Sequence, residues 1–187
     1  TSVQYYNNFT GLGTGNYTYT AYAQDLAGNV NATAERNVVV DLTGPGVTLV
    51  SPADGIYTGN ASLNLTASLT DDFSGILNAT LFIYNSTGLN TTSVITGFAA
   101  STLSAAVGVV VQFIDGIYTW FWSAFDVFGN EGVSANRTIT FDTTIPLVNF
   151  TKPTPSNGST VSGSFEINIS ITDTNLINLT YNFNGTE

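Results

Sequence analysis

Cysteine, histidine and methionine are absent from this 187-residue chain. Their absence removes thiol nucleophiles, disulfides, imidazole bases and the usual protein ligands of zinc and copper. A Ser-His or Cys-His catalytic pair therefore cannot exist in it. The acidic residues fall mostly on expected turns, whereas glycoside hydrolysis needs two carboxylates that face each other across a cleft. These absences predict a protein that is not an enzyme.

Charge is scarce as well, and positive charge is the scarcest. Charged residues make up 9% of the chain, and 13 acidic residues against 3 basic ones give a net charge of −10. This balance repels phosphate backbones and excludes a nucleic-acid partner. The apolar stretch at residues 105–114 is far shorter than the ~20 residues of a spanning helix. We expect no membrane insertion by this segment and, since no signal peptide is present, a mature form or a slice of a longer chain.

What the chain does contain is an internal repeat with an offset of 101 residues. A period of this size indicates an array of domain-sized modules, which usually spans distance or builds assemblies rather than hosting chemistry. The matching segments are Tyr17-Thr18-Tyr19 with Tyr118-Thr119-Trp120, Asp25-x-x-Gly28-Asn29 with Asp126-x-x-Gly129-Asn130, and Asp41-x-x-x-Pro45 with Asp142-x-x-x-Pro146.

The repeat divides the chain into one complete module and two halves. Residues 42–142 form the complete module, residues 1–41 supply the second half of one copy, and residues 143–187 supply the first half of another. Neither half can close a sandwich alone. Two explanations stay open: the chain is a slice of a longer tandem array, or residues 143–187 of one subunit are completed by residues 1–41 of a neighbour through strand addition.

Polar and apolar residues alternate between Gly, Asn, Asp and Pro almost throughout, which predicts strands rather than helices. Seven strands in about a hundred residues are typical of an antiparallel β-sandwich. The Asp-x-x-Gly-Asn element falls between two of them and is predicted to form a hairpin turn. In the complete module we expect strands at 47–50, 61–70, 78–84, 93–98, 106–114, 117–125 and 134–141.

Four segments lie at the expected turns and joints: Asp126-Val127-Phe128-Gly129-Asn130, Asp142-Thr143-Thr144-Ile145-Pro146, Ser51-Pro52-Ala53-Asp54-Gly55 and Asp72-Phe73-Ser74-Gly75-Ile76. Together they resemble the immunoglobulin-like repeats of large archaeal and bacterial surface proteins. The resemblance implies an all-β fold of tandem immunoglobulin-like or fibronectin-III-like antiparallel β-sandwich repeats at an extracellular cell surface. It leaves the task open, because adhesins, surface layers, filaments and enzyme spacers share such domains.

Asn-x-Ser/Thr sequons are frequent enough to predict dense N-linked glycosylation. They begin at 14 of the 20 asparagines, whereas random placement would give roughly 5. Alternating strands write some such triplets by accident, but asparagine is a poor strand former. Glycans would imply export, with an archaeal cell surface as the expected setting. The sequons begin at Asn8, Asn16, Asn31, Asn60, Asn64, Asn78, Asn85, Asn90, Asn136, Asn149, Asn157, Asn168, Asn178 and Asn184.

Residues 73–114 contain no charged side chain, so their surface needs another solvating or covering layer. Either glycans coat this surface or a neighbouring subunit buries it. In the strand expected at 117–125, Phe121 and Phe125 fall on the outward face and are candidate interface anchors. A covering loop or glycan stem is the equal alternative.

The acidic residues offer a weak case for a metal. Asp71 and Asp72 form an acidic pair in a loop, while Asp41 and Asp142 lie at the joints. Calcium takes six to eight oxygens from such loops, but no spacing like that of an EF-hand occurs. Ordinary turn formation is the stronger explanation, so we expect no metal and no cofactor other than covalent glycans. Asp71, Asp72 and Asp142 are the residues that calcium would use.

The repeats and the sequons, with the missing catalytic residues, favour a structural role. We expect a subunit of a glycosylated extracellular filament or surface layer that self-associates head-to-tail into a homopolymer through its sandwich domains. The alternative is the stalk of a cell-surface adhesin, whose repeats hold a distant recognition domain away from the cell. A spacer of a carbohydrate-active enzyme would need a catalytic domain outside these residues.

Overall fold

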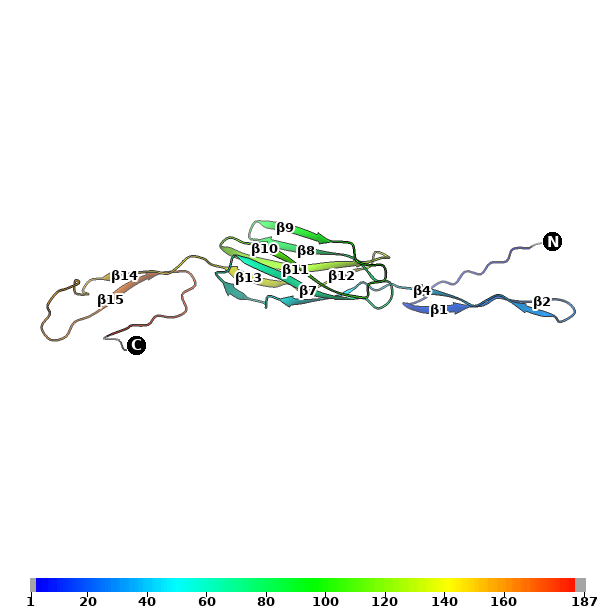
Figure 1. Cartoon of the computed structure of the whole chain (residues 1–187), viewed down its shortest axis with the longest axis horizontal. Helices are drawn as coiled ribbons and strands as arrows, with labels where there is room; N and C mark the ends of the chain where they lie inside the picture. Colours follow the sequence, from blue (N-terminus) through cyan, green and yellow to red (C-terminus); the bar gives the residue numbers. More distant parts are fainter. Residues whose placement is uncertain (1–2, 184–187) are drawn as a thin grey trace.

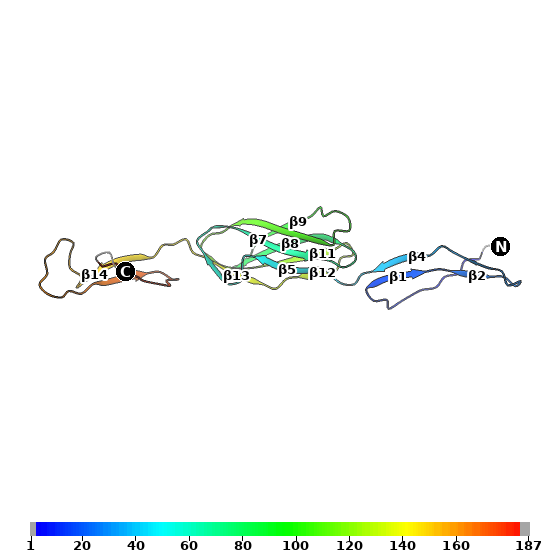
Figure 2. The ribbon, with the colours of Figure 1, turned by 60° about the horizontal axis from the view of Figure 1, so that its bottom comes forward.

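The computed structural model describes residues 3–183, and every regular element within them is a β-strand. The strands fall into three groups along an elongated molecule, with the largest group in the middle and a smaller one at each side (Figure 1). The same separation is visible after rotation of the molecule (Figure 2). The described residues contain no helix that is long and apolar enough to cross a membrane.

The middle group is a two-sheet sandwich, which we call the central module. One sheet has the strand order β10-β7-β5, and the other has the order β6-β13-β11-β8-β9 with β12 paired to β11. Its strands are β5 (Gly46–Ser51), β6 (Ile56–Thr58), β7 (Ser62–Thr70), β8 (Ile76–Asn85), β9 (Gly88–Ile95), β10 (Ser104–Gln112), β11 (Gly116–Asp126), β12 (Glu131–Val133) and β13 (Arg137–Phe141).

Three details of the predicted strand pattern are wrong. The strand expected at 93–98 is β9, Gly88–Ile95, because Asn85 accepts hydrogen bonds from Thr87 in a tight turn and the chain returns along β8 at once. The short strands β6 and β12 are additional to the seven expected ones. The pairing is antiparallel except between β13 and β6, which run parallel.

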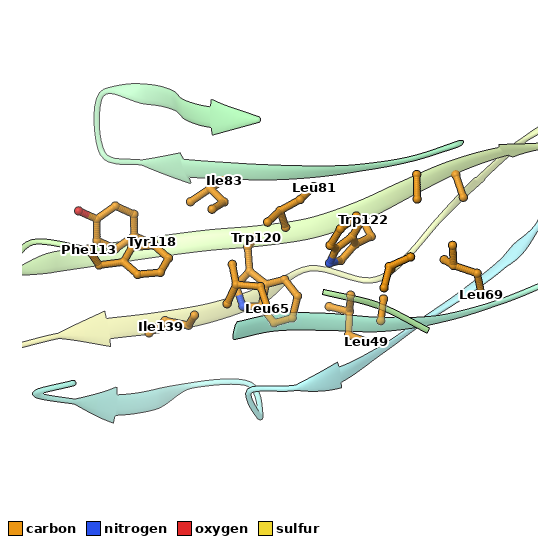
Figure 3. Packing of buried hydrophobic residues seen from close by; sticks show 14 of the residues in the cluster. Leu49, Leu65, Leu69, Leu81, Ile83, Phe113, Tyr118, Trp120, Trp122 and Ile139 are labelled. Carbon is orange, nitrogen blue, oxygen red and sulfur yellow. The ribbon is translucent and has the colours of Figure 1, made fainter. Parts of the chain in front are cut away.

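The core of the central module lies between the two sheets (Figure 3). On β11, alternate side chains point inward, so that Trp120 and Trp122 are completely buried. Leucines of β5 and β7 and residues of β8 and β13 surround them in Figure 3. A buried Leu or Ile of this kind contributes about 1.5–3 kcal/mol. The two indole Nε1 atoms have no hydrogen-bond partner among the described residues.

The first flanking group, the N-terminal half-module, consists of β1 (Gly15–Tyr19), β2 (Tyr22–Gln24), β3 (Val30–Ala32) and β4 (Arg36–Val40). Strand β1 pairs with β4, and β2 pairs with β3. The register repeats that of the central module: Tyr17 lies opposite Val38 as Tyr118 lies opposite Ile139. These strands therefore correspond to β11, β12 and β13.

The other flanking group, the C-terminal half-module, consists of β14 (Leu147–Thr151) and β15 (Asn168–Thr172). Val148 lies opposite Ile171 as Val47 lies opposite Leu69, so the pair corresponds to β5 and β7. The bond before Pro153 is cis, like the bond before Pro52 in the central module. Each half-module thus repeats a local part of the sandwich.

Candidate functional site

The N-terminal half-module exposes a face that is core in the central module. Tyr19 is 50% exposed and Val38 is 45% exposed. Their counterparts, Trp120 and Ile139, are completely buried between the two sheets. The opposite sheet makes this difference, because the strand pairing is the same in both places. The half-module therefore presents an uncovered apolar face that is suited to a complementary sheet.

The C-terminal half-module has the matching property. Phe150 on β14 is 74% exposed, whereas its counterpart Leu49 on β5 is 7% exposed. Val148 is also exposed, while the corresponding Val47 packs against the core. The strands equivalent to β11 and β13 would cover this face, and the N-terminal half-module consists of such strands. Each half-module thus has the kind of strands that would cover the exposed face of the other.

The Asp-x-x-Gly-Asn turn forms in the same way with and without a sandwich around it. Asp25 Oδ1 accepts the backbone N–H of Asn29 at 2.8 Å, and Asp126 Oδ1 accepts that of Asn130 at 2.9 Å. A hydrogen bond from the Asn29 side chain is the largest cause that lowers the pKa of Asp25. Asp126 is completely buried, whereas Asp25 is exposed. The turn therefore depends on local interactions and has the same form whether or not a sandwich encloses it.

The joint in front of the central module is packed tightly against β12. A Cβ atom added to Gly132 would lie 1.7 Å from the carbonyl oxygen of Pro45, and one added to Gly44 would lie 2.2 Å from that of Glu131. At an offset of 101 residues, Asn31 and Ile145 take the places of these two glycines. The two half-modules cannot therefore meet with an identical joint. If the two half-modules met, the backbone at their joint would have to lie farther apart than it does in the central module.

Three buried carboxylates meet at this same joint. Asp41 follows β4, Asp71 follows β7, and Asp126 ends β11. The three side chains are 7%, 8% and 0% exposed, and one carboxylate oxygen from each lies within 4.8 Å of the others. Asn130 connects the cluster to the joint, because its Nδ2 donates to the Asp41 carbonyl at 3.2 Å and to Asp126 Oδ2 at 2.7 Å.

The cluster differs from the residues that the sequence offered to calcium. Asp71 belongs to it, but its neighbour Asp72 is exposed and lies outside. Asp142 is at the other joint, where its Oδ2 accepts the side-chain N–H of Asn175 at 2.6 Å. In the sequence alone, Asp41 appears at a joint without a link to Asp71, and Asp126 appears as a turn residue. The signal available in the sequence was that Asp41 and Asp126 each belong to a repeated motif, Asp-x-x-x-Pro and Asp-x-x-Gly-Asn.

Phe121 is half-buried by its own chain rather than fully exposed. Its ring stacks on Phe82 of β8 at a centroid distance of 5.1 Å and on Tyr84 at 6.0 Å. Phe125 is also half-buried, opposite Asn78 on β8 and Glu131 on β12. This aromatic row covers part of the outer face of the larger sheet. A role of Phe121 and Phe125 in an interface stays a prediction.

The sequon asparagines are exposed or half-buried in the part of the chain that the structure describes. Among the described residues, no sequon asparagine is buried, and Asn184 lies outside these residues. Their glycosylation stays a prediction. Three of the asparagines are half-buried, namely Asn78, Asn85 and Asn168. The exposed ones are Asn8, Asn16, Asn31, Asn60, Asn64, Asn90, Asn136, Asn149, Asn157 and Asn178.

Comparison with known proteins agrees with the Ig-like fold expected from the sequence. Residues 1–84, slightly less than half of the chain, match the family model of the bacterial Ig-like domain, group 3. Such domains are typical of extracellular, cell-surface proteins and are usually non-catalytic. The family match and the all-β sandwich confirm the resemblance and the fold class.

A solved structure of the fibronectin(III)-like modules of Clostridium thermocellum CbhA is also similar. The identity is 18%, and the similarity covers 71% of this chain and 65% of that chain with a TM-score of 0.40. No curated protein matches the chain.

Proposed function

We propose that this chain is a structural, non-enzymatic part of a cell-surface protein in which Ig-like modules follow one another as a rod. The observation that carries the proposal is the repeated strand register. Tyr17 faces Val38 as Tyr118 faces Ile139, and Val148 faces Ile171 as Val47 faces Leu69. Module-like structure therefore continues on both sides of the central module, as in a tandem array.

The path of the chain through the central module supports a rod. The chain enters at the end that faces β4 and leaves at the opposite end toward β14 (Figure 1). The entry joint is held by the Asn130 side chain on the carbonyl of Asp41 and by the close contact of Pro45 with Gly132. Such an arrangement transmits force along the long axis and keeps a distal part of the protein away from the cell.

Self-association into a filament is the second candidate function, and the uncovered faces favour it. The exposed Val38 and Tyr19 of one subunit would be buried against Val148 and Phe150 of the next. The joint of such a hybrid module differs from that of the central module, because Ile145 replaces a glycine that has no room for a Cβ. We therefore place the rod of a tandem array first and the homopolymer second.

Sedimentation velocity and small-angle X-ray scattering over a range of concentrations separate the two candidates. The array predicts an elongated monomer at every concentration, and the filament predicts species that grow with concentration. If growth occurs, Val38→Asp and Val148→Asp should abolish it, since both place a charge on a face that would be buried. Leu77→Asp, at an exposed site of the central module, is the matched control. A compact monomer would contradict both candidates.

The proposed transmission of force along the rod has a mechanical test. When the chain is stretched between residues 42 and 142, we expect the central module to unfold in one cooperative step. The step should lengthen the chain by roughly 330–360 Å, less the folded separation of the two points. Extension in several small steps at low force would show that the module does not resist tension, and the rod proposal would then be wrong.

We also propose that N-linked glycans solvate the rod. The charge-free segment at 73–114 needs such a layer, and the sequon asparagines of the described part of the chain are exposed or half-buried. Intact mass measurement of protein from its native source should show mass beyond the polypeptide that a peptide N-glycosidase or hydrazinolysis removes. A mass equal to that of the bare chain would rule this layer out.

A further inference from the structure

We propose that the free edge of β10 pairs with β10 of a second copy of this chain, in antiparallel orientation. Strand β10 ends the smaller sheet, and within residues 3–183 only β7 pairs with it. Its nine residues pair with β7 without any register shift, from Ser104 opposite Thr70 to Gln112 opposite Ser62. A long and regular edge of this kind is a template on which another strand can add.

The other edges of the two sheets have features that oppose such pairing. Strand β5 has a register shift between Leu49 and Ser51, and Pro52 follows the strand directly. The ladder between β8 and β9 also has a register shift, where Asn90 of β9 has no opposite residue. Strands β6 and β12 have only three residues each. Bulges, prolines, charges and short strands are the usual protection of an edge, and β10 has none of them.

The backbone of β10 presents every second residue to the free edge. The N–H of Phe113 donates to the carbonyl of Ala61 at 2.8 Å, and the carbonyl of Leu103 accepts the N–H of Asp71 at 2.8 Å. The odd-numbered residues therefore face β7. In an antiparallel ladder the residues between them direct their N–H and C=O groups to the other side. The even-numbered residues of β10 thus offer donors and acceptors to a further strand.

The core is incomplete along the same edge. Leu65 and Leu69, which point inward from β7, are completely buried. Their direct neighbours on β10, Val109 and Ala105, are only half-buried although they pack against the core. On the outer face of the sheet, Val110 is 65% exposed. A strand beyond β10 would cover these side chains as well as bind the backbone groups of the edge.

Charge favours a second copy of the chain as the partner. The net charge of −10 opposes contact between two copies over most of their surface. No charged residue lies between Asp72 and Asp115, and β10 belongs to this segment. Two copies can therefore approach along β10 without bringing like charges of the two strands together. A positively charged partner, by contrast, would find nothing on this strand to attract it.

The sequence of β10 also suits pairing with itself. When two copies pair about a two-fold axis at Gly108, all nine residues of each strand have an opposite residue. Ala106 then lies opposite Val110, and Ser104 lies opposite Gln112. These pairs join small or uncharged side chains. The even-numbered residues, which face the free edge, are opposite one another throughout, as hydrogen-bonded pairs require.

The pairing would join rods side by side, and this consequence rests on the proposed array. One edge buries little surface, so two separate chains should associate weakly. At the repeat offset, residues 3–11 take the place of β10, and this segment likewise contains no charge and no proline. If successive modules of an array offer such edges, each contact raises the effective concentration for the next. The rods would then adhere along their length.

Sedimentation equilibrium of the full 187-residue chain, up to the highest soluble concentration, tests the pairing. We expect a reversible monomer–dimer equilibrium that stops at two copies, because each copy has used its edge. Val110→Pro removes an N–H from the free edge but none that bonds β7. The pair then loses a hydrogen bond at two symmetric positions, so association should weaken about tenfold or more. Val110→Thr, which keeps the N–H and the branched shape, is the matched control and should pair as the natural chain does.

Cysteine crosslinking tests the register independently, because the natural chain has no cysteine. Hydrogen-bonded pairs have Cα atoms about 5.5 Å apart, a distance that a disulfide spans. On oxidation, a mixture of Ala106→Cys and Val110→Cys chains should therefore form dimers, while each variant alone should not. Val94→Cys lies on β9 at a site of similar exposure, 59%. Mixed with Ala106→Cys, it is the control and should stay monomeric.

Three results would overturn the pairing: a natural chain that is monomeric at every concentration, association that Val110→Pro leaves unchanged, or equal crosslinking in the control mixture. If Val110→Pro fails to fold, the cysteine variants still decide. The folded Val110→Pro chain should be the elongated monomer expected of the array, so array and filament are then separated in this variant. A monomeric natural chain would leave the rod proposal intact, and failure of the stretching experiment would leave the pairing of β10 intact.

Discussion

Strands β11 and β13 of the central module and strands β1 and β4 of the N-terminal half-module pair in one register and frame the same Asp-x-x-Gly-Asn turn. Their burial differs completely, because Trp120 and Ile139 are inaccessible while Tyr19 and Val38 are about half exposed. Pairing and turns thus follow from local sequence, whereas a core needs the second sheet. An isolated two-stranded pair is marginally stable at best.

Arginine shows the same contrast at the level of one side chain. In the central module, the Arg137 guanidinium donates to the carbonyls of Leu49, Val50 and Pro52 and so ties β13 to the opposite sheet. Arg36 takes the same place in the half-module, where no strand within residues 3–183 pairs as a counterpart of β5. One residue type in one local structure therefore has different consequences. Substitutions at matched positions can measure that difference.

The largest expected effect is that of Trp120→Ala. Removal of this fully buried indole should cost the central module about 3–5 kcal/mol. The matched change Tyr19→Ala, at a half-exposed position, should alter the unfolding free energy by less than about 0.5 kcal/mol. Denaturant unfolding followed by tryptophan fluorescence measures both, from Trp122 alone in Trp120→Ala and from Trp120 and Trp122 in Tyr19→Ala.

A loss of 3–5 kcal/mol is a large part of the stability of a domain, which is typically about 5–15 kcal/mol. If Trp120→Ala fails to fold, Trp120→Phe is a milder substitution whose effect on the unfolding free energy can be measured. Equal costs at Tyr19 and Trp120 would mean that the half-module is covered in solution, and the comparison between the two regions would then break down.

Much of the fold was predictable from sequence, because alternation and turn residues are local signals. The long strands β7, β8, β10 and β11 lie close to their predicted positions. The predicted position of strand β9 was wrong because the turn made by Asn85 and Thr87 lies within a polar run that has no Pro to mark it. The short strands β6 and β12 were not predicted, because three residues are too few to show an alternation of polar and apolar side chains.

The acidic cluster was less predictable, because it depends on which loops share one end of the sandwich. Asp71 and Asp126 are 55 positions apart in the sequence and meet only after β7 and β11 are placed in facing sheets. The sequence showed each aspartate as a turn former, and each does hold its own turn. What it could not show was the burial of all three carboxylates at one joint, since that depends on the packing of the central module.

A smaller effect is expected of Gly132→Ala at the tight joint. The new Cβ would collide with the backbone of Pro45, which cannot rotate away as a flexible side chain does. Overpacking of this kind costs about 1–3 kcal/mol. Asn31→Ala, the matched change in the half-module, should be close to neutral because that position is exposed. Thermal unfolding compares the two variants. An unchanged Tm of Gly132→Ala would show that the backbone at the joint moves apart easily, and it would favour the filament as the proposed function.

Arg137→Lys should have a smaller effect still. Lysine keeps the charge but loses the planar fork that reaches several carbonyls at once, so we expect a cost of about 1–2 kcal/mol. Arg36→Lys should change the stability by less than about 0.5 kcal/mol. Chemical denaturation of both variants gives the difference. Equal effects would mean that the carbonyl contacts of Arg137 add nothing to the stability of the sandwich.

The smallest expected difference is in how the stability of the central module depends on pH when one of two exposed carboxylates, Asp54 or Asp25, is replaced. Hydrogen bonds from the backbone and the hydroxyl of Thr138 lower the pKa of Asp54, and a bond from the Asn29 side chain lowers that of Asp25. A lowered folded-state pKa stabilises the fold above the unfolded value near 3.8, and this contribution is lost as the pH falls through the folded pKa. For Asp54 the bond joins two distant segments of the central module, so its titration is linked to unfolding of that module.

The bonds of Asp25 lie within one hairpin of the half-module, so we expect its titration not to be linked to unfolding of the central module. Asp54→Asn should therefore flatten the loss of central-module stability below pH 4, while Asp25→Asn should leave it unchanged. NMR titration should find both pKa values lowered in the natural chain. Acid unfolding of the two variants then distinguishes the hydrogen bond of Asp54, which is linked to unfolding, from that of Asp25, which is local. An equal effect of the two substitutions on acid unfolding would mean that the half-module and the central module unfold together, and the joint would then transmit stability as well as force.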